Sequence, residues 1–413
     1  MESISVFFAY LLTRLPLILT FASGYMVYLL LANTKLTDVF VTWSLKRSRG
    51  NLKTLLAYII GVAALLSFFI PNAVTVLTLL PFLKTIEKEL TQDHDGRVTT
   101  ALTLSAIYGA NIGGMGSLIG SPANLLLIGA LDLYNVPGRE QISFLNWFFW
   151  SVPLVVLFVA TAWGLIVTFG VSKQMQGVAA NLDDMAGSPG LSLDQKRGGQ
   201  LFVLFVAFWI LEGILRALWP VFARIEPYVC VGYFVLFVHL TFVKPWGQKR
   251  APLLRLKHMV SGLPKRGLVF LGVVILLIPV IRGFQLDQRA AAFFSDLIRP
   301  GTSAFLVFFG ITLSVIFLTE LLSNTVVSTA FFSIAFFAAP IHDMAPLILM
   351  IAVSIASTCA FMTPVATPCN ALAFGEMKST SLGKMLVLGL PLNIIGALLI
   401  TLWLQFVIPF VYG

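Results

Sequence analysis

The chain has 413 residues, of which 58% are hydrophobic and 11% are charged. Ordinary soluble domains are about half apolar and a quarter charged, so this composition excludes a soluble protein and predicts an all-α polytopic membrane protein. The net charge of +9 resides mostly in loops, where basic residues orient spans and contact lipid, so the lipid bilayer is an expected partner and nucleic acid is not.

The N-terminal segment, residues 4–33, is one long apolar stretch interrupted at Pro16. We expect Pro16 to begin the true span, with Ile4 to Thr13 as an interfacial lead-in. Residues 35–53 contain five basic residues and one aspartate, which is typical of a cytoplasmic segment. We therefore assign residues 1–53 to an N-terminal span and a cytoplasmic interfacial segment of a scaffold.

Residues 54–131 are predicted to form the first part of a transport domain. Pro71 and Asn72 break the apolar stretch 54–83 into two pieces that are each too short to cross a bilayer, which favours a re-entrant hairpin. The next stretch, 98–131, holds a glycine-rich run that ends in Ser121-Pro122 and predicts a broken helix with exposed backbone groups.

The middle of the chain, residues 132–302, is assigned to scaffold spans around a central polar linker at 172–199. Glu212 and Arg216 lie four residues apart, so we expect a structural ion pair on one helical face. The predicted elements are spans at 144–171, 200–222, 228–243 and 267–281, a basic inside loop at 244–266, and an amphipathic interfacial helix at 283–299.

The second part of the transport domain is predicted at 303–376, followed by residues 377–413, which hold a final span at 384–411. Hydroxyls, an amide and a carboxylate gather inside the apolar run 313–334, and a second polar run begins at Thr363. Such groups are costly in hydrocarbon and normally face a cavity or a ligand. We therefore expect a hairpin at 303–339 and a broken helix at 346–376.

The two halves repeat one ordered pattern. The first half reads Ser67-x3-Pro71-Asn72 and then Ser121-Pro122-x-Asn124. The second half reads Thr319-x3-Ser323-Asn324 and then Thr367-Pro368-x-Asn370. Counting crossings from the basic loops makes the two repeats inverted, the arrangement that places a transporter's site at the midplane. The first repeat is shorter than the second by roughly two helices at its N-terminus.

The hairpin tips and helix breaks predict a binding site for a cation and an anion. Carbonyl, hydroxyl and amide oxygens suit an alkali cation, and helix N-termini suit an anion. No Lys or Arg lies in the tips or breaks, so we expect co-bound cations to neutralise the anion. Candidate cation ligands are Ser67, Asn72, Gly120, Thr319, Leu322, Asn324 and Ala366, of which Gly120, Leu322 and Ala366 offer only backbone oxygens. Candidate anion-binding residues are Asn72, Ser121, Ser323, Asn324, Thr325, Thr367 and Pro368.

Other polar residues leave alternatives open. Any single Ser or Thr in a membrane helix is more often a packing residue, whereas asparagines repeated beside matching breaks favour a site. Glu320 either ties down the second hairpin or titrates as a proton site. The scattered histidines indicate neither a transition metal site nor a catalytic group, so we expect no enzyme and no organic cofactor. These histidines are His94, His239, His258 and His342.

The runs Thr319-Glu-Leu-Leu-Ser-Asn-Thr and Pro364-Val-Ala-Thr-Pro-Cys-Asn resemble the divalent anion/sodium symporter family, part of the wider ion transporter superfamily. The resemblance covers about residue 54 to the C-terminus. It implies sodium as the coupling ion, uptake of a dicarboxylate, citrate or sulfate, a homodimer, and an elevator movement of the hairpin domain. The first tip reads Pro71-Asn72-Ala73 where the family has Ser-Asn-Thr, and similar tips occur in superfamily members that carry citrate–metal complexes or expel arsenite.

These observations predict a secondary active transporter that imports a small divalent anion with sodium by alternating access. The alternative within the superfamily is a proton-coupled antiporter or efflux permease with Glu320 as the proton carrier. A passive channel is a third possibility, because inverted breaks also occur in channels. We expect the protein in the bacterial inner membrane.

Overall fold

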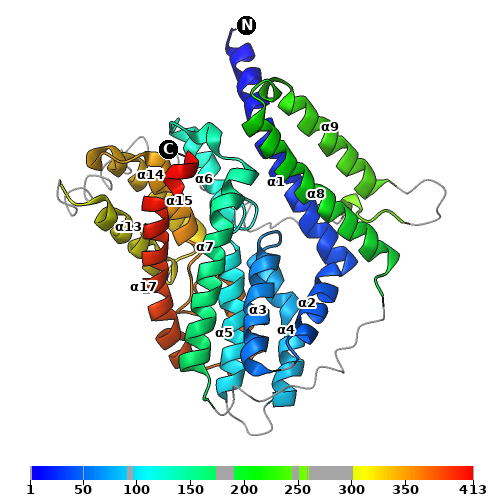
Figure 1. Ribbon diagram of the computed structural model, residues 1–413, viewed down its shortest axis with the longest axis vertical. Coiled ribbons are helices and arrows are strands. Elements are labelled where there is room, and N and C mark those ends of the chain that lie inside the picture. The colour runs from blue at the N-terminus through cyan, green and yellow to red at the C-terminus, as the bar shows by residue number, and fades with distance from the viewer. Residues whose placement is uncertain are drawn as a thin grey trace. The chain divides into compact units, whose positions relative to one another are not determined.

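The structure, a computed structural model, describes residues 2–49, 51–90, 96–173, 190–243, 251–257, 259 and 301–412, with side chains from residue 12 onward. The regular elements of these ranges are helical (Figure 1). The basic loop at 244–266, the span at 267–281 and the amphipathic helix at 283–299 fall largely or wholly outside the described residues, as does most of the linker at 172–199.

The described helices fall into two compact units. Unit 1 comprises residues 1–40, 143–147 and 187–269, and unit 2 comprises residues 41–142, 148–186 and 270–413. Unit 1 holds α1 (Glu2–Thr34), α8 (Leu193–Leu218) and α9 (Phe222–Phe242), and α2 (Leu36–Arg47) runs from unit 1 into unit 2. Unit 2 holds α3 (Leu52–Ser67), α4 (Asn72–Leu90), α5 (Gly96–Gly113), α6 (Pro122–Leu133), most of α7 (Phe144–Leu165), α13 (Ala304–Thr319), α14 (Asn324–Ala338), α15 (Pro346–Ala356), α16 (Pro368–Glu376), α17 (Leu382–Phe406) and α18 (Ile408–Tyr412).

Among the described residues, six helices are long and apolar enough to cross a membrane. The hairpin helices α3 and α13 and the half-helices α6 and α15 are apolar but shorter, as a re-entrant element requires. An integral multi-pass membrane protein is therefore confirmed. The six candidate spans are Leu12–Thr34, Phe144–Gly170, Leu193–Leu218, Phe222–Phe242, Asn324–His342 and Leu382–Phe406.

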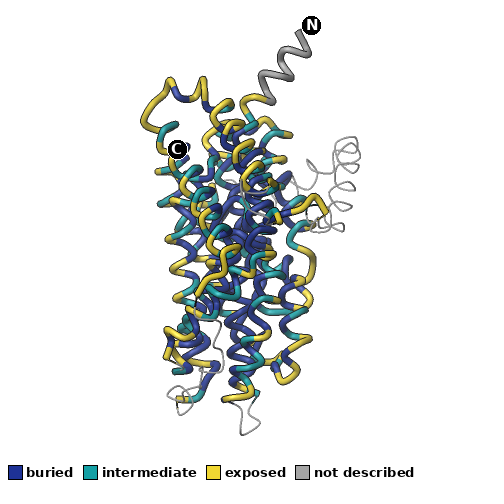
Figure 2. The backbone as a smooth tube through the Cα atoms, turned by 90° about the vertical axis from the view of Figure 1, so that its right-hand side faces the viewer, coloured by how far each residue is buried: buried dark blue, intermediate teal, exposed yellow. Residues whose placement is uncertain are grey.

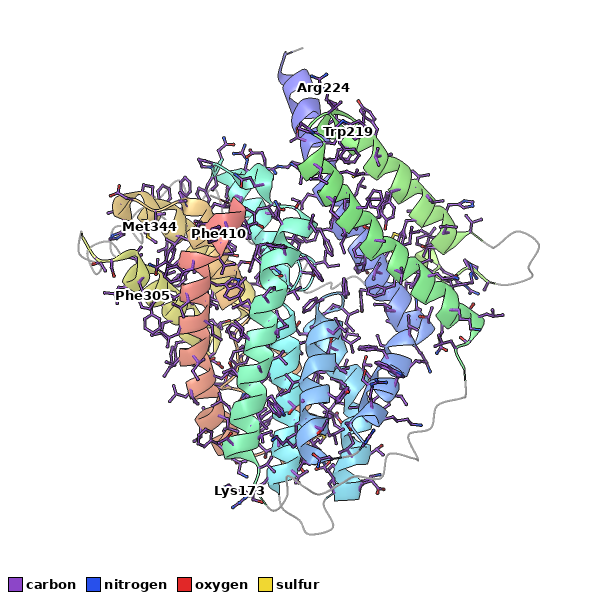
Figure 3. The ribbon with its side chains drawn as sticks, viewed as in Figure 1. Lys173, Trp219, Arg224, Phe305, Met344 and Phe410 are labelled. Atoms are coloured by element: carbon purple, nitrogen blue, oxygen red, sulfur yellow. The ribbon has the colours of Figure 1, made fainter. Side chains whose placement is uncertain are left out.

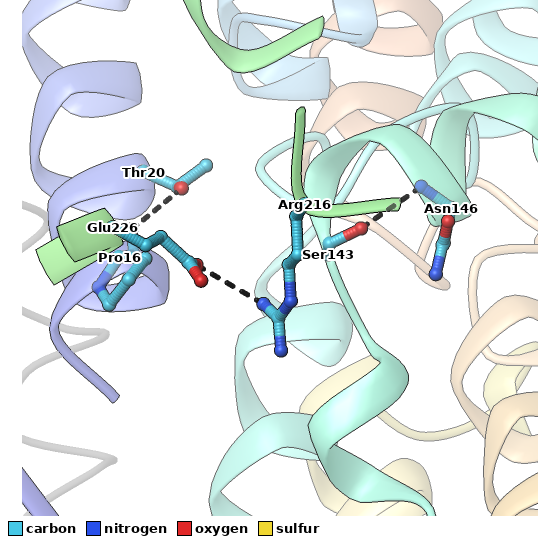
Figure 4. Close-up of polar contacts among 6 residues, drawn as sticks. All are labelled: Pro16, Thr20, Ser143, Asn146, Arg216 and Glu226. Atoms are coloured by element: carbon cyan, nitrogen blue, oxygen red, sulfur yellow. Dashed lines mark hydrogen bonds and ion pairs between the residues drawn. The ribbon is translucent and has the colours of Figure 1, made fainter. Parts of the chain in front are cut away.

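One predicted boundary is wrong. The span was expected to begin at Pro16, but α1 runs without interruption from Glu2 to Thr34 with Pro16 inside it, and its candidate span begins at Leu12. Proline removes one backbone donor, but the neighbouring turns of a membrane helix tolerate this when side chains satisfy the freed groups. The carbonyl that loses its helical donor is that of Leu12. Thr20 Oγ1 donates to the carbonyl of Pro16 itself at 2.9 Å (Figure 4).

Unit 1 packs α8 and α9 against α1 through a mixture of close and polar contacts. Trp209 Nε1 donates to Ser23 Oγ at 3.3 Å. Arg216 on α8 forms an ion pair of 3.2 Å with Glu226 on α9 (Figure 4), a partner that helical spacing alone did not predict. Glu212, one turn before Arg216, is buried and interacts electrostatically with both of these groups.

Unit 2 is built around α5, which is buried along its length from Val98 to Gly113. Figure 2 draws the buried stretches of the backbone in dark blue. Two glycines let α5 approach α3 closely. A Cβ on Gly109 would collide with the Ile60 carbonyl, and a Cβ on Gly113 would collide with the Ala64 carbonyl. Small residues allow membrane helices to pack at this distance. The first hairpin, α3 and α4, is thereby fixed to the first broken helix, α5 and α6.

The second half of unit 2 repeats this plan with α13 and α14 as hairpin and α15 and α16 as broken helix. The tips of the two hairpins are residues 68–72 and 320–324, each ending in the asparagine that begins the next helix, and the two breaks are residues 114–121 and 357–367. The names first tip, second tip, first break and second break are used for these segments below. The predicted order of hairpin and broken helix in each half is confirmed.

The two hairpins enter unit 2 from opposite ends. Lys84, near the outer end of the first hairpin, forms a 2.6 Å ion pair with Glu376 at the end of α16. At the other end, the Tyr134 ring that follows α6 stacks on Phe336 of α14, with 4.7 Å between centroids. Because α5 and α6 together run from one end of unit 2 to the other, the repeats are inverted. In Figure 3, Lys173 after α7 marks the first end, and Met344 and Phe410 lie at the other.

Candidate functional site

Two asparagines hold the breaks open in the same way. Asn124 donates from Nδ2 to carbonyls ten and seven residues earlier in the chain, at 3.2 and 2.8 Å. Asn370 donates from Nδ2 to carbonyls ten and seven residues earlier, at 3.0 and 2.9 Å. Both side chains are fully buried. The acceptors are the carbonyls of Gly114 and Ser117 in the first break and of Ala360 and Thr363 in the second. The sequence repeat therefore reflects a repeated hydrogen-bond pattern.

Each break ends in a capped helix N-terminus. The Ser121 hydroxyl accepts a hydrogen bond from the Ala123 N–H at the start of α6. The Thr367 hydroxyl accepts one from the Asn370 N–H at the start of α16, at 3.3 Å. A proline follows each capping residue, where its missing N–H costs nothing. The positive ends of the dipoles of α6 and α16 consequently lie at the breaks. The positive ends of the dipoles of α4 and α14 lie at the tips, because these two helices begin there.

The first tip keeps one amide oxygen available. Ser67 Oγ donates to Thr75 Oγ1 at 2.9 Å and so joins the two helices of the hairpin beside the tip. Asn72 donates from Nδ2 to Asn111 Oδ1 at 3.3 Å, while Asn72 Oδ1 is buried and has no hydrogen-bond partner among the described residues. An oxygen in this situation is a suitable ligand for a cation, because burial without a partner is costly.

Gly120 of the first break lies against the first tip. A Cβ at this position would come within 2.9 Å of the Ser67 carbonyl and 2.8 Å of the Gly114 carbonyl. Gly114 in turn faces the Asn72 amide, whose oxygen would lie 3.2 Å from a Cβ there. The three candidate cation ligands of the first repeat, Ser67, Asn72 and Gly120, are therefore neighbours in space.

The second tip is organised by Thr319. Its hydroxyl lies 2.6 Å from Asn324 Oδ1 and 3.1 Å from the Ser357 carbonyl in the second break. The Ser323 hydroxyl caps α14 by accepting from the Val326 N–H at 3.4 Å. The remaining candidates differ in exposure: Ala366 and Thr367 are buried, Asn324 and Thr325 half-buried, and Leu322, Ser323 and Pro368 exposed.

Glu320 is held by hydrogen-bond donors from outside its hairpin. Oε1 accepts from the backbone N–H of Phe361 at 2.6 Å and of Met362 at 2.8 Å, and Oε2 accepts from the N–H of Thr363 at 2.9 Å. Asn393 on α17 donates from Nδ2 to Oε1 at 2.9 Å. The carboxylate thus binds the second tip to the second break.

Asn111 is a central residue that the sequence did not single out. Its Nδ2 donates to the Ala360 carbonyl at 2.8 Å and to Asn370 Oδ1 at 2.9 Å. Its Oδ1 accepts from Asn72 Nδ2 at 3.3 Å and from Cys369 Sγ at 3.1 Å. A single amide therefore links the first tip to the second break. Asn111 lies in the glycine-rich run, but the second repeat has Ser357 at the matching place, so the repeat gave no signal for it.

The site offers oxygen ligands and no clustered metal-binding set. Groups of three or more His, Cys, Asp or Glu residues that could hold a metal ion do not occur in the described part of the chain. His94 and His258 lie outside the described residues. No Lys or Arg occurs in either tip or either break. An anion bound there would depend on helix N-termini, hydroxyls and co-bound cations for its neutralisation.

Together, the inverted hairpin and broken-helix pairs define a transporter of the class that binds its cargo between two pseudo-symmetric halves. Comparisons with known proteins agree. A family model described as "Citrate transporter" matches residues 3–248, and the chain belongs to this family. The resemblance to the divalent anion/sodium symporters of the ion transporter superfamily is confirmed, and the protein is a transporter rather than an enzyme.

Individual relatives support the same assignment. The sodium-dependent dicarboxylate transporter SdcS of Staphylococcus saprophyticus is 27% identical over 379 residues, which cover 87% of this chain and 70% of SdcS. An uncharacterized transporter of Haemophilus influenzae is 24% identical over 404 residues, which cover 93% of this chain and 79% of that transporter. These bacterial relatives are consistent with a place in the inner membrane. The YdaH transporter of Alcanivorax borkumensis, whose crystal structure reveals an unusual topology, is similar in structure, with a TM-score of 0.63 and 14% sequence identity. The match covers 98% of this chain and 89% of YdaH, so the two proteins share a fold.

Proposed function

We propose that this protein is a sodium-coupled symporter of a small divalent anion, either a dicarboxylate, citrate or sulfate. The observation that carries the proposal is the pair of tip-and-break sites, which present oxygen ligands and helix N-termini but no basic side chain. A divalent anion in such a site needs cations beside it, so the two are expected to bind together. The names of the SdcS relatives, as sodium-dependent dicarboxylate transporters, support sodium and a dicarboxylate.

In the proposed site, two cations bind near the tips and the anion binds between them. The first cation takes Ser67, Asn72 and Gly120, and the second takes Thr319, Leu322, Asn324 and Ala366. The anion contacts Asn72 and Asn324 from the tips. It further contacts Ser121, Ser323, Thr325, Thr367 and Pro368, the capping and first-turn residues of the helices.

Transport is proposed to proceed by an elevator movement in which the two hairpins and two broken helices travel as one body. Their polar connections support this, since Asn111 joins the first tip to the second break and Ser354 Oγ donates to Asn124 Oδ1 at 2.9 Å. A homodimer and the division into scaffold (1–53, 132–302) and transport segments (54–131, 303–376) remain predictions.

Thermal stability of the purified protein in detergent tests the coupling directly. A ligand that binds only the folded state adds about 2.7 kcal/mol of stability at one hundred times its Kd. We expect succinate, citrate or sulfate to raise the Tm in sodium buffer but not in choline buffer. A stabilising anion then serves for uptake into vesicles with an inward sodium gradient. An anion that stabilises equally in choline, or uptake that ignores the gradient, would contradict sodium symport.

A further inference from the structure

The second break contains three consecutive backbone N–H groups that no helix satisfies. Phe361, Met362 and Thr363 lie after the last turn of α15 and before the first turn of α16, so no preceding helical carbonyl is placed to accept from them. All three N–H groups donate to the Glu320 carboxylate, at 2.6, 2.8 and 2.9 Å. The side chain of one residue in the second tip therefore supplies the acceptors for all three of these N–H groups.

The backbone of Glu320 takes part in the same attachment. Its carbonyl accepts from the Thr363 hydroxyl at 2.7 Å. On the other side, Asn393 of α17 donates to the carboxylate at 2.9 Å. Four donors converge on the two oxygens of the side chain, three on Oε1 and one on Oε2. The hydrogen-bond geometry therefore fixes the Glu320 side chain against the second break.

The first repeat makes the same attachment without a charge. The Ser117 hydroxyl donates to the Phe68 carbonyl, which corresponds to the bond from Thr363 to Glu320. Phe68 thus occupies the place of Glu320. Its ring lies across Gly116, where an added Cβ would collide with it. The first tip is held to its break by an aromatic ring, and the second tip by the hydrogen-bonded Glu320 side chain.

From this asymmetry we propose that Glu320 is a positioning residue, which fixes the second tip to the second break and thereby shapes the second cation site. Glu320 directly follows Thr319, whose hydroxyl lies 2.6 Å from Asn324 Oδ1. Loosening the carboxylate would release both of these candidate ligands. The proposal deepens the proposed function and rests on it for the cation, but the attachment itself can be measured without any transport.

Hydrogen exchange of the purified full-length protein tests the attachment. In Glu320→Gln, and more strongly in Glu320→Ala, we expect the amides of residues 361–363 to exchange about tenfold faster or more, because their acceptor is weakened or lost. Glu376→Gln is the matched control, since it removes an exposed carboxylate of α16 whose partner is Lys84. Unchanged exchange at 361–363 in both Glu320 variants would overturn the proposal, whatever the protein transports.

Uptake measurements then separate a positioning role from proton carriage. For Glu320→Gln, the sodium concentration for half-maximal uptake should rise about tenfold, while kcat at saturating sodium stays within about twofold of the parent. Between pH 6 and 8, uptake by Glu320→Gln should change with pH by the same factor as uptake by the parent protein. The other titratable groups in the field of Glu320 are Tyr108 and Cys359, whose usual pKa values lie above this range. An unchanged sodium requirement, or a pH dependence that disappears, would overturn the positioning role.

Discussion

The four repeated asparagines fall into two pairs with different environments. Asn124 and Asn370 are fully buried, and their side-chain amides donate hydrogen bonds to carbonyls of the breaks. Asn72 and Asn324 are half-buried at the tips. We expect Asn72→Ala and Asn324→Ala to reduce uptake at least about tenfold with a smaller fall in Tm than the buried pair, because each removes a candidate ligand and only one hydrogen bond, to Asn111 or from Thr319. Asn124→Ala and Asn370→Ala should instead lose stability by about 1–3 kcal/mol for each carbonyl left unsatisfied.

The comparison uses expression, Tm in detergent and uptake for all four variants. Each pair serves as the control for the other, since the substitution is the same and only the position differs. Normal uptake in both tip variants would show that the site has been assigned to the wrong residues.

At the residue scale, the sequence predicted the positions that repeat and missed those that do not. Asn72, Asn124, Asn324 and Asn370 were found because each has a mate in the other half. Asn111 has no equivalent asparagine in the other half, and its four hydrogen bonds reach segments up to 259 residues away in the chain. The partners of Glu320 were equally invisible, because they are backbone groups exposed by a break 41–43 residues further on.

At the scale of elements, the close contact between α3 and α5 depends on glycine. In Gly113→Ala the new methyl would collide with the Ala64 carbonyl, a backbone atom that cannot move aside without shifting α3. We expect a loss of about 1–3 kcal/mol, measured as a lower Tm in detergent. Gly61→Ala is the control, because Gly61 lies on α3 with nothing within 4 Å of its added Cβ. That variant should be neutral or more stable by up to about 1 kcal/mol. Equal effects at the two positions would contradict the glycine contact.

Element positions followed well from apolar length and from proline and polar breaks. The second broken helix, expected at 346–376, appears as α15 and α16 between Pro346 and Glu376. Pro16 shows where a local rule fails. Proline commonly begins a helix, but a membrane helix can also contain one when its surroundings satisfy the backbone, and sequence alone does not distinguish these cases.

At the scale of the whole molecule, the inverted repeats of unit 2 meet along polar seams as well as at the site. At the end where α5 begins, Thr103 Oγ1 lies 2.9 Å from Thr380 Oγ1, and the Ser381 N–H donates to Thr100 Oγ1 at 2.9 Å. These contacts join the first broken helix to the segment that follows the second broken helix, although the residues are 277 or more positions apart in the chain. This explains how two hairpins that enter from opposite ends can belong to one unit.

A cross-link at this seam tests whether unit 2 moves as one body. Because their hydroxyls are neighbours, Thr103→Cys with Thr380→Cys should form a disulfide on oxidation, detectable by mass spectrometry. If the segment that follows α16 travels with the first broken helix, the distance between the two residues does not change during transport, and the cross-linked protein should retain at least about half of its uptake. The single-cysteine variants, oxidised in parallel, control for the native cysteines Cys230, Cys359 and Cys369, which are free and buried. Uptake that stops on oxidation of the double variant alone and returns on reduction would mean that α5 and the segment after α16 must separate in each cycle, and a rigid elevator body that includes both would then be ruled out.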